Sequence, residues 1–265
     1  MIAYSLMHTT DNNAYPLVSI ITVTYNAASS IEPTMLSVSS QTASDYEHIV
    51  MDGASSDKTL EIVNNHKTGH THIFSSPDKG IYDAMNKAMD VARGKYLLFL
   101  NAGDTFAGSD ALARFITAIE NNNMPDIVYG QTLLVDSDRK VLGPRHLEAP
   151  ENLTLDSFRN GMVVCHQAFM VQRKIAPLYN IHYRFSADYE WCIRCLQQAQ
   201  RNIYLGSKPV IHYLSEGLTT HNHKSSLKER FDIMAEYFGI MPTILRHFGF
   251  ATRYLRRRHN SINAQ

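Results

Sequence analysis

The 265-residue chain lacks the sequence features of nucleic-acid-binding, membrane-spanning and disulfide-rich secreted proteins. It has no excess charge, because 25 Lys and Arg residues balance 25 Asp and Glu residues, and this argues against a nucleic-acid partner. Its apolar runs reach only about half of the roughly 20 residues that span a bilayer, and no signal-peptide pattern precedes Pro16. Three cysteines fit a reducing compartment better than a disulfide framework. These absences predict a cytoplasmic protein.

The order of the apolar segments predicts an α/β fold. In the first half, apolar runs at 18–24, 48–51, 73–75 and 96–100 alternate with segments that carry apolar residues at helical spacing. This repetition is typical of a Rossmann-like, mostly parallel sheet flanked by helices. Further strands are expected at 126–135, 161–171 and 207–213, and further helices near 110–121, from 186 onward and at 224–239.

The length suits one large domain or two small ones. We expect a flexible leader at 1–15, a single domain at 16–240 and a basic amphipathic tail at 241–265. Within the domain, residues 16–130 carry the strand–helix repeats and residues 131–240 form a mixed half.

The chain is organised around one strand and the loop that follows it, Lys95 to Thr105 (KYLLFLNAGDT). The apolar run reads as a central strand buried on both faces. Ligands of open α/β sheets sit outside the carboxyl ends of the strands, so Asp104 is expected to face a ligand crevice. The alternative is that Asp104 only caps a loop or the next helix. Asp52 and Asp78 lie at or close after two other strand ends, and this favours a charged ligand or a metal.

With these strand ends placed, the first half resembles the family 2 glycosyltransferases, which have the GT-A fold. The resemblance covers residues 17–105 and is carried by four segments in order: VSIITVTYN, VMDGASSDKT, SPDKGIYDAMNKAM and LLFLNAGD. The DKGIYDAMNKA variant resembles enzymes that build bacterial exopolysaccharide or other envelope glycans. Beyond residue 130, only HQAFMV and SADYEW are similar to the acceptor half of the family.

The resemblance implies a nucleotide-sugar donor that is bound by residues 16–130. Asp52 would accept a hydrogen bond from a base imide N–H, which uracil has; the alternative is a turn residue before Gly53. The other donor contacts would come from the first-strand loop and the start of the third helix: Thr24, Tyr25, Asn26, Asp78, Lys79, Gly80, Asp83 and Asn86. For Asp83 and Asn86 the alternative is a solvated helix face.

The resemblance also implies a divalent cation, Mn²⁺ or Mg²⁺, that neutralises the diphosphate. Asp104 matches the metal-binding acid of the family's DxD-type pair, but Gly103 stands where the first acid is expected. Asn101 could compensate as a neutral oxygen ligand. A late histidine is a further candidate ligand, and the spacing does not choose among His212, His221 and His223.

In the second half, Asp188 matches the family's general base, which takes a proton from the acceptor hydroxyl in an inverting reaction. The alternative is an acid at a helix N-terminus that only interacts with the helix dipole. His166 and Gln167, polar residues inside an apolar run, are expected to contact the acceptor or the sugar; a buried structural histidine is the plain alternative. The acceptor would be a glycan or a polyprenyl-linked sugar.

Two other functions compete with this one. A scaffold protein that has lost catalysis would explain the missing first acid and the alanine before Asp188. A nucleotidyltransferase would need a glycine-rich, basic loop after the first strand, and Tyr25 to Ala28 has neither feature.

The tail carries apolar residues among arginines, a composition suited to an anionic membrane surface. Packing on its own domain, or a homodimer contact, are the alternatives. The residues concerned are Leu245, Phe248, Phe250 and Leu255, with Arg246, Arg253, Arg256, Arg257 and Arg258.

Overall fold

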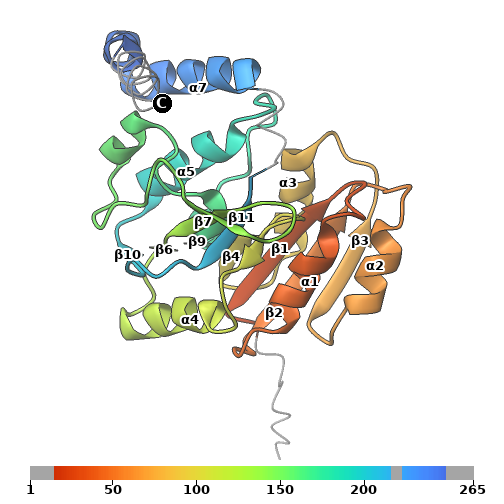
Figure 1. Ribbon diagram of the computed structural model, residues 1–265. Helices are drawn as coiled ribbons and strands as arrows, with labels where there is room; N and C mark the ends of the chain where they lie inside the picture. The colour runs from red at the N-terminus through yellow and green to blue at the C-terminus, as the bar shows by residue number, and fades with distance from the viewer. Residues whose placement is uncertain (1–14, 216–222, 249–265) are drawn as a thin grey trace, which may run out of the picture.

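The computed structural model describes residues 15–215 and 223–248. The predicted leader therefore lies outside the described residues except for Tyr15, and the predicted tail beyond residue 248 lies outside them as well. Figure 1 shows a central sheet with helices on both of its faces.

The main sheet has seven strands in the order β10-β6-β9-β4-β1-β2-β3. All neighbouring strands are parallel except β9, which runs antiparallel to both β4 and β6. This confirms the predicted α/β fold with a mostly parallel sheet. The strands are β1 (Val18–Thr24), β2 (Tyr46–Asp52), β3 (Thr71–Ser75), β4 (Tyr96–Phe99), β6 (Ile127–Tyr129), β9 (Phe169–Gln172) and β10 (Asn202–Tyr204).

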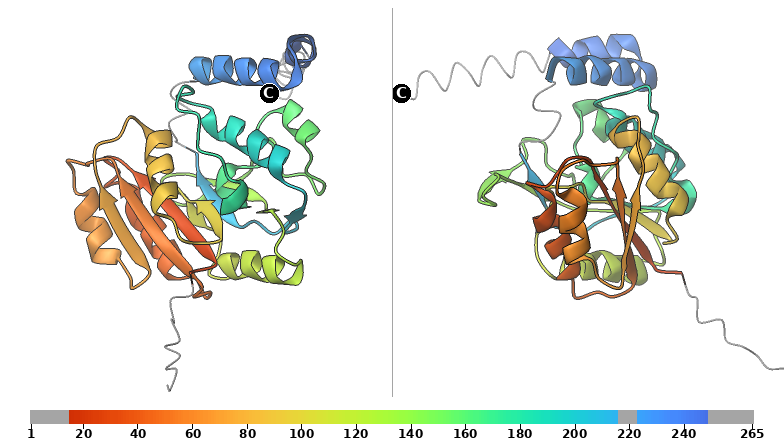
Figure 2. Two further views of the ribbon diagram at one scale, coloured as in Figure 1. Left: turned by 180° about the vertical axis from the view of Figure 1, so that it is seen from behind. Right: turned by 90° about the vertical axis from the view of Figure 1, so that its right-hand side faces the viewer.

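Helices cover both faces of this sheet, as Figure 2 shows from two further sides. Alternating side chains of β1 divide between two buried clusters: Ile21 packs with α3 and α5, and Ile20 packs with α4. Burial on both faces explains why the strands are continuous apolar runs. The helices are α1 (Ile31–Ser39), α2 (Thr59–His66), α3 (Ile81–Val91), α4 (Ala111–Asn121), α5 (Ala187–Gln198) and α7 (His223–Phe238).

A second sheet of four strands, in the order β5-β11-β7-β8, lies beside the main one. Its strands are β5 (Thr105–Phe106), β7 (Thr132–Val135), β8 (Val141–Pro144) and β11 (Ile211–Leu214). The prediction of one strand over 126–135 was wrong, because β6 and β7 belong to different sheets. The chain crosses between them at Gly130, where a Cβ atom would come within 2.8 Å of the Val210 side chain. Only glycine allows this close approach.

Short 3₁₀ turns interrupt the later part of the chain: η1 (Leu155–Asn160), η2 (His166–Ala168) and η3 (Arg173–Ile175). The predicted strand over 161–171 therefore begins only at Phe169, since η2 comes directly before β9. The strand β10 was not predicted. Among the described residues, none of the helices is long and apolar enough to cross a membrane.

Candidate active site

A pocket of about 500 Å³ opens beyond the carboxyl ends of β1 and β4. Its walls come from the end of β1, the start of α3, the loop after β4, the turn η2, the start of α5 and β11, with single residues from elsewhere. This is the position where open α/β sheets bind ligands. Eight of the predicted site residues line it: Thr24, Tyr25, Asp78, Gly80, Asp104, His166, Gln167 and Asp188.

Asp104 is buried in the pocket wall, with 4% of its surface exposed. Its carboxylate accepts hydrogen bonds from the Gln167 amide (2.7 Å) and from the backbone N–H of Leu214 (3.0 Å). Burial raises the pKa of Asp104 to about 6, because the charged form loses hydration, although both hydrogen bonds act in the opposite direction. Asp104 is thus a carboxylate that is costly to leave charged without a cationic partner.

The loop that carries Asp104 is held by three hydrogen bonds with Thr34 and Arg139. The Thr34 hydroxyl donates to the Asp104 carbonyl (2.8 Å) and accepts from the Gly103 N–H (2.9 Å). The Arg139 guanidinium donates to the Gly103 carbonyl (2.6 Å). Gly103 has φ of 102°, and a Cβ atom there would meet Leu214 at 2.8 Å. The same glycine that replaces the expected acid therefore lets the loop pass under β11.

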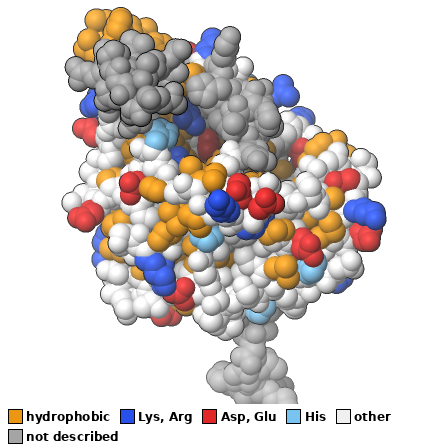
Figure 3. Space-filling model, viewed as in Figure 1, with side chains coloured by type: hydrophobic (Ala, Val, Ile, Leu, Met, Phe, Trp, Pro, Cys, Tyr) orange, Lys and Arg blue, Asp and Glu red, His pale blue; other side chains and the backbone are white. Residues whose placement is uncertain are grey.

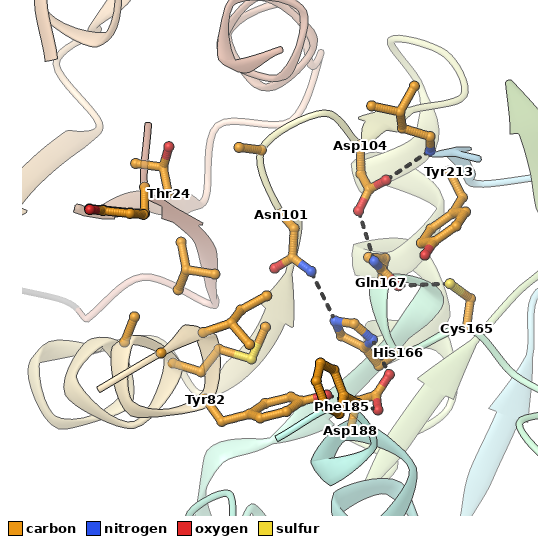
Figure 4. A pocket seen from close by; sticks show the side chains of 18 of the residues that line it. Thr24, Tyr82, Asn101, Asp104, Cys165, His166, Gln167, Phe185, Asp188 and Tyr213 are labelled. Atoms are coloured by element: carbon orange, nitrogen blue, oxygen red, sulfur yellow. Dashed lines mark hydrogen bonds and ion pairs between the residues drawn. The ribbon is translucent and has the colours of Figure 1, made fainter. Parts of the chain in front are cut away.

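Gln167 is oriented by its other neighbour in the pocket, Cys165. The Cys165 thiol donates to the Gln167 carbonyl oxygen at 2.7 Å, so the Gln167 amide nitrogen faces Asp104 (Figure 4). Burial raises the pKa of Cys165 to about 11, which keeps the thiol protonated and able to donate. Gln167 therefore fixes the position of the Asp104 carboxylate.

Asp188 lies at the first turn of α5, and three groups of the protein donate to its carboxylate. Oδ1 accepts from the Tyr82 hydroxyl (3.2 Å) and from the Tyr189 N–H (2.9 Å), and Oδ2 lies 3.2 Å from Nδ1 of His166. Burial pushes the pKa of Asp188 upward, but the hydrogen bonds from His166 and the Tyr189 N–H, together with the positive charge of Arg230, outweigh burial and lower it. Asp188 is therefore ionised at neutral pH.

His166 connects Asp188 to the loop after β4. While Nδ1 faces Asp188, Nε2 lies 3.3 Å from the Asn101 amide nitrogen (Figure 4). In this arrangement Nδ1 donates and Nε2 accepts, which is the neutral tautomer that fits both partners. His166 and Gln167, adjacent in sequence, thus each hold one of the two acids of the pocket. The expected contact of His166 and Gln167 with the acceptor or the sugar stays a prediction.

Two polar atoms of the pocket wall are buried and have no hydrogen-bond partner among the described residues: Thr24 Oγ1 and Asn101 Oδ1. In Figure 4 the Asn101 amide turns its nitrogen toward His166 and its oxygen away, toward the side of Thr24. Buried polar atoms without partners are uncommon, and at a pocket they indicate a polar ligand.

The polar groups of the pocket wall also show whether a divalent cation would fit there. Asp104 and Asn101 supply the carboxylate and amide oxygens that Mg²⁺ or Mn²⁺ prefers. The described residues contain no group of three acidic, histidine or cysteine side chains able to hold a metal by themselves. The residues present fit a cation that a bound diphosphate would help to hold. Of the late histidines, His212 does not line the pocket, His221 lies outside the described residues, and the side chain of His223 does too.

At the β2 side, the pocket wall is formed by Tyr25 and Asp78, with Gly53 between them. A Cβ atom at Gly53 would lie 2.4 Å from Oδ2 of Asp78 and 3.3 Å from the Tyr25 ring. The Tyr25 side chain is 64% exposed and forms an aromatic surface at the edge of the pocket. Gly53 was not predicted as a site residue, and its absent side chain leaves room for both neighbours.

Five predicted donor residues do not line the pocket: Asn26, Asp52, Lys79, Asp83 and Asn86. Asp52 is fully buried and accepts from the hydroxyls of Ser55 and Ser75 and from the Ser55 N–H. Its predicted contact with a base stays a prediction.

Three of the other four have side chains that bond to the protein itself, whereas Lys79 is exposed and contributes only its backbone N–H. Asn26, with φ of 48°, accepts from the Ser56 N–H (2.9 Å). Asp83 accepts from the backbone N–H of Lys79 (3.0 Å) at the start of α3. Asn86 exchanges two hydrogen bonds with the backbone of Tyr179 (3.0 and 2.7 Å).

Other lining residues were missed by the sequence reasoning. Tyr82 lies within the third matching segment, which was a usable signal. Three arginines, Arg145, Arg184 and Arg230, add positive charge to the wall. Arg230 lies on the amphipathic helix α7, where an arginine gives no signal because it usually faces solvent.

Comparisons with known proteins relate the chain to glycosyltransferases. The sequence profile described as Glycosyl transferase family 2 matches residues 19–177. A "PGL/p-HBAD biosynthesis glycosyltransferase" of Mycobacterium tuberculosis is 35% identical over 189 residues, which cover 69% of this chain and 70% of the relative.

Two solved structures share the fold. TarS 1–349 of S. aureus, in complex with UDP-GlcNAc, has a TM-score of 0.66 at 17% identity over 88% of this chain and 73% of that one. The mannosyltransferase PcManGT of Pyrobaculum calidifontis, in complex with GDP-Man and Mn²⁺, has a TM-score of 0.63 at 14% identity over 96% and 82%. The profile match over more than half of its length and the 35% identity to the mycobacterial relative show that the chain belongs to glycosyl transferase family 2.

Proposed function

We propose that this glycosyltransferase inverts the anomeric centre of a UDP-linked hexose as it transfers the sugar to a hydroxyl of a glycan or a lipid-linked acceptor in polysaccharide biosynthesis. One observation carries the proposal: the carboxylates of Asp104 and Asp188 line a single pocket, and the consecutive residues His166 and Gln167 hydrogen-bond to them. One acid is suited to the leaving-group side and the other to the acceptor side of one reacting sugar.

In the proposed reaction the acceptor oxygen forms a bond to the anomeric carbon while the bond from that carbon to the diphosphate oxygen breaks. The acceptor proton passes to Asp188, and the nucleoside diphosphate leaves with the bonding electron pair. Oδ1 of Asp188 already accepts two hydrogen bonds, whereas Oδ2 accepts only from His166. We therefore assign Oδ2 as the atom that receives the proton. Its lowered pKa keeps Asp188 in the basic form at neutral pH.

The diphosphate carries charge that must be offset as the bond breaks. Asp104 and Asn101 would hold Mn²⁺ or Mg²⁺, which when bound supplies Lewis acidity to the diphosphate oxygens. The pocket wall also carries three arginines that could offset the charge of the diphosphate, since guanidinium groups bind phosphate well: Arg145, Arg184 and Arg230. On the donor-base side, we propose that the exposed Tyr25 ring and Asp78 flank the nucleoside, with Asp52 behind them.

A screen of sugar nucleotides tests this function. Release of UDP or GDP is measured with Mn²⁺ and with EDTA, for the natural chain, for Asp188→Asn and for Asp90→Asn. Asp90 is an exposed acid of α3 and serves as the matched control. We expect turnover of at least one UDP-sugar by the natural chain and by Asp90→Asn, and none by Asp188→Asn, which should still bind UDP. Binding of UDP without turnover by the natural chain would instead favour a scaffold protein.

A further inference from the structure

The last described element presents an apolar face to solvent. The helix α7 ends at Phe238, Gly239 follows with φ of 87°, and residues 240–248 form a second helix (dark blue at the end of α7 in Figure 1). Residues at i, i+1, i+4, i+5 and i+8 lie on one face of a helix. In this helix those positions are all apolar: Ile240, Met241, Ile244, Leu245 and Phe248.

This face points away from the protein. Ile240, Met241, Leu245 and Phe248 are 58%, 63%, 68% and 68% exposed. The edge of the helix that carries Thr243 and His247 contacts the domain: Thr243 is 1% exposed, and the His247 ring meets the Phe231 ring of α7 at 5.0 Å between centroids. In Figure 3 hydrophobic side chains form the outer surface at this end of the molecule. An amphipathic helix that packs through its polar side and exposes its apolar side indicates a partner.

The charge of this part of the chain identifies the partner. Residues 240–265 contain five arginines and no aspartate or glutamate, in a protein whose total charge balances. Apolar and aromatic residues among arginines match a bilayer surface with anionic headgroups, which accepts both kinds of side chain. A second copy of the chain is a poorer match, because it would bring its own arginines to the contact. One nine-residue helix also offers less than the about 800 Å² per partner of a standard interface.

We propose that the exposed face of helix 240–248 docks on an anionic membrane surface. The contact would be linked to the active site through the preceding helix α7, whose Arg230 lines the pocket. Tyr237 and Glu229 of α7 further tie it to α5 and to the segment before it: the Tyr237 hydroxyl donates to Glu190 (2.7 Å), and Glu229 accepts from two backbone N–H groups (2.9 and 2.8 Å). A bound membrane would thus lie at a fixed position relative to the pocket. The proposal does not depend on the reaction proposed above.

The test is co-sedimentation of the full chain with vesicles of phosphatidylcholine alone or mixed with phosphatidylglycerol. The test variant is the double substitution Leu245→Glu and Phe248→Glu. Leu36→Glu is the matched control, because Leu36 is a leucine on the helix α1 with 48% exposure. Thermal unfolding of each variant shows that the fold is kept. Sedimentation velocity without vesicles reports the oligomeric state.

We expect the natural chain and Leu36→Glu to pellet with the anionic vesicles, and the double variant to lose at least tenfold in apparent affinity. Binding should also weaken as salt is raised, because the arginines act through screened charge. Two results would overturn the proposal: no pelleting of the natural chain, or equal pelleting of the double variant. A dimer of the natural chain that the double variant breaks, with no vesicle binding, would assign the face to a second copy instead.

Discussion

Nδ1 of His166 lies 3.2 Å from Oδ2 of Asp188, while Nε2 of the same ring lies 3.3 Å from the Asn101 amide. The imidazole thus spans the distance between the helix that carries the proposed base and the loop after β4 that carries Asp104. A shift of that loop, for example on donor binding, would move the His166 ring and so change the hydrogen bond that Asp188 accepts from it. In this arrangement His166 is a positioning residue for the base.

Loss of His166 should change the pH dependence of transfer. The hydrogen bond from His166 lowers the pKa of Asp188 against the effect of burial, so His166→Ala should raise it. Because the base must be unprotonated, the acid limb of the rate profile should move to higher pH, with a fall in kcat of about 10- to 100-fold. His166→Asn, whose amide nitrogen can take the place of Nδ1, should restore part of the rate.

The measurement is the rate of UDP release against pH with the donor found by screening. His182→Ala is the control, because His182 is exposed and lies outside the pocket. An acid limb at the same pH in His166→Ala and the natural chain would show that His166 does not act on the base.

Tyr82→Phe should lower kcat while leaving the KM for the donor near its natural value. The substitution removes the hydroxyl that donates to Oδ1 of Asp188 (3.2 Å) and keeps the ring stacked on Tyr179 (5.5 Å between centroids). The loss should be about tenfold, as for the removal of one hydrogen bond to a charged group. Tyr183→Phe, which removes a hydroxyl bonded to Glu236 on the surface (3.0 Å), is the control. Equal kcat values for the two variants would contradict a role for Tyr82.

Asp104→Asn should change how stability depends on pH. Burial raises the pKa of Asp104 from 3.8 to about 6, so between these values the folded protein holds a proton that the unfolded chain has lost. The free energy of unfolding therefore falls as pH rises from about 4 to 6, by up to about 3 kcal/mol, and this contribution stays lost above pH 6. In the asparagine variant the fall is absent.

Urea unfolding in EDTA at pH 4.5 and pH 7.5 checks this, with the exposed Asp90→Asn as control. The free energy of unfolding of Asp104→Asn should rise relative to the natural chain between the two pH values. The same variant should bind UDP equally with and without Mn²⁺ in titration calorimetry. A difference from the natural chain that is the same at both pH values would mean that Asp104 is not protonated on burial.

Gly53→Ala should weaken UDP binding by tenfold or more. A methyl group at this position would lie 2.4 Å from Oδ2 of Asp78, so Asp78 or the Tyr25 ring must move out of the pocket wall. Gly69→Ala is the matched control, since a Cβ atom there meets nothing within 4 Å. Calorimetric titration of both variants with UDP compares them. Equal affinities would separate this side of the pocket from the nucleoside.

The first four strands of the main sheet, and the position of Asp104 after the fourth apolar run, could be predicted from the sequence alone. The strands β1, β2 and β4 are buried along their whole length and were predictable because burial on both faces favours apolar runs. The edge strand β3 has no buried residue and was predicted from the short apolar pair Ile73 and Phe74. The parallel order then places the carboxyl ends of β1 and β4 at one edge, and with them Thr24 and the loop that leads to Asp104. Asp188 was found through its resemblance to a known motif and not through any local pattern.

How the side chains of the site are used depends on contacts that form only in the folded protein. His166 meets a residue of a later helix, Gln167 meets the loop of an earlier strand, and neither distance in the sequence has a local signal. The break between β6 and β7 depends on the Val210 side chain, which approaches Gly130 from 80 positions further along the chain. In helix 240–248 the periodicity predicts an apolar face, but packing against α7 decides that this face points outward. Each of these outcomes depends on contacts between distant segments, and such contacts exist only once the chain has folded.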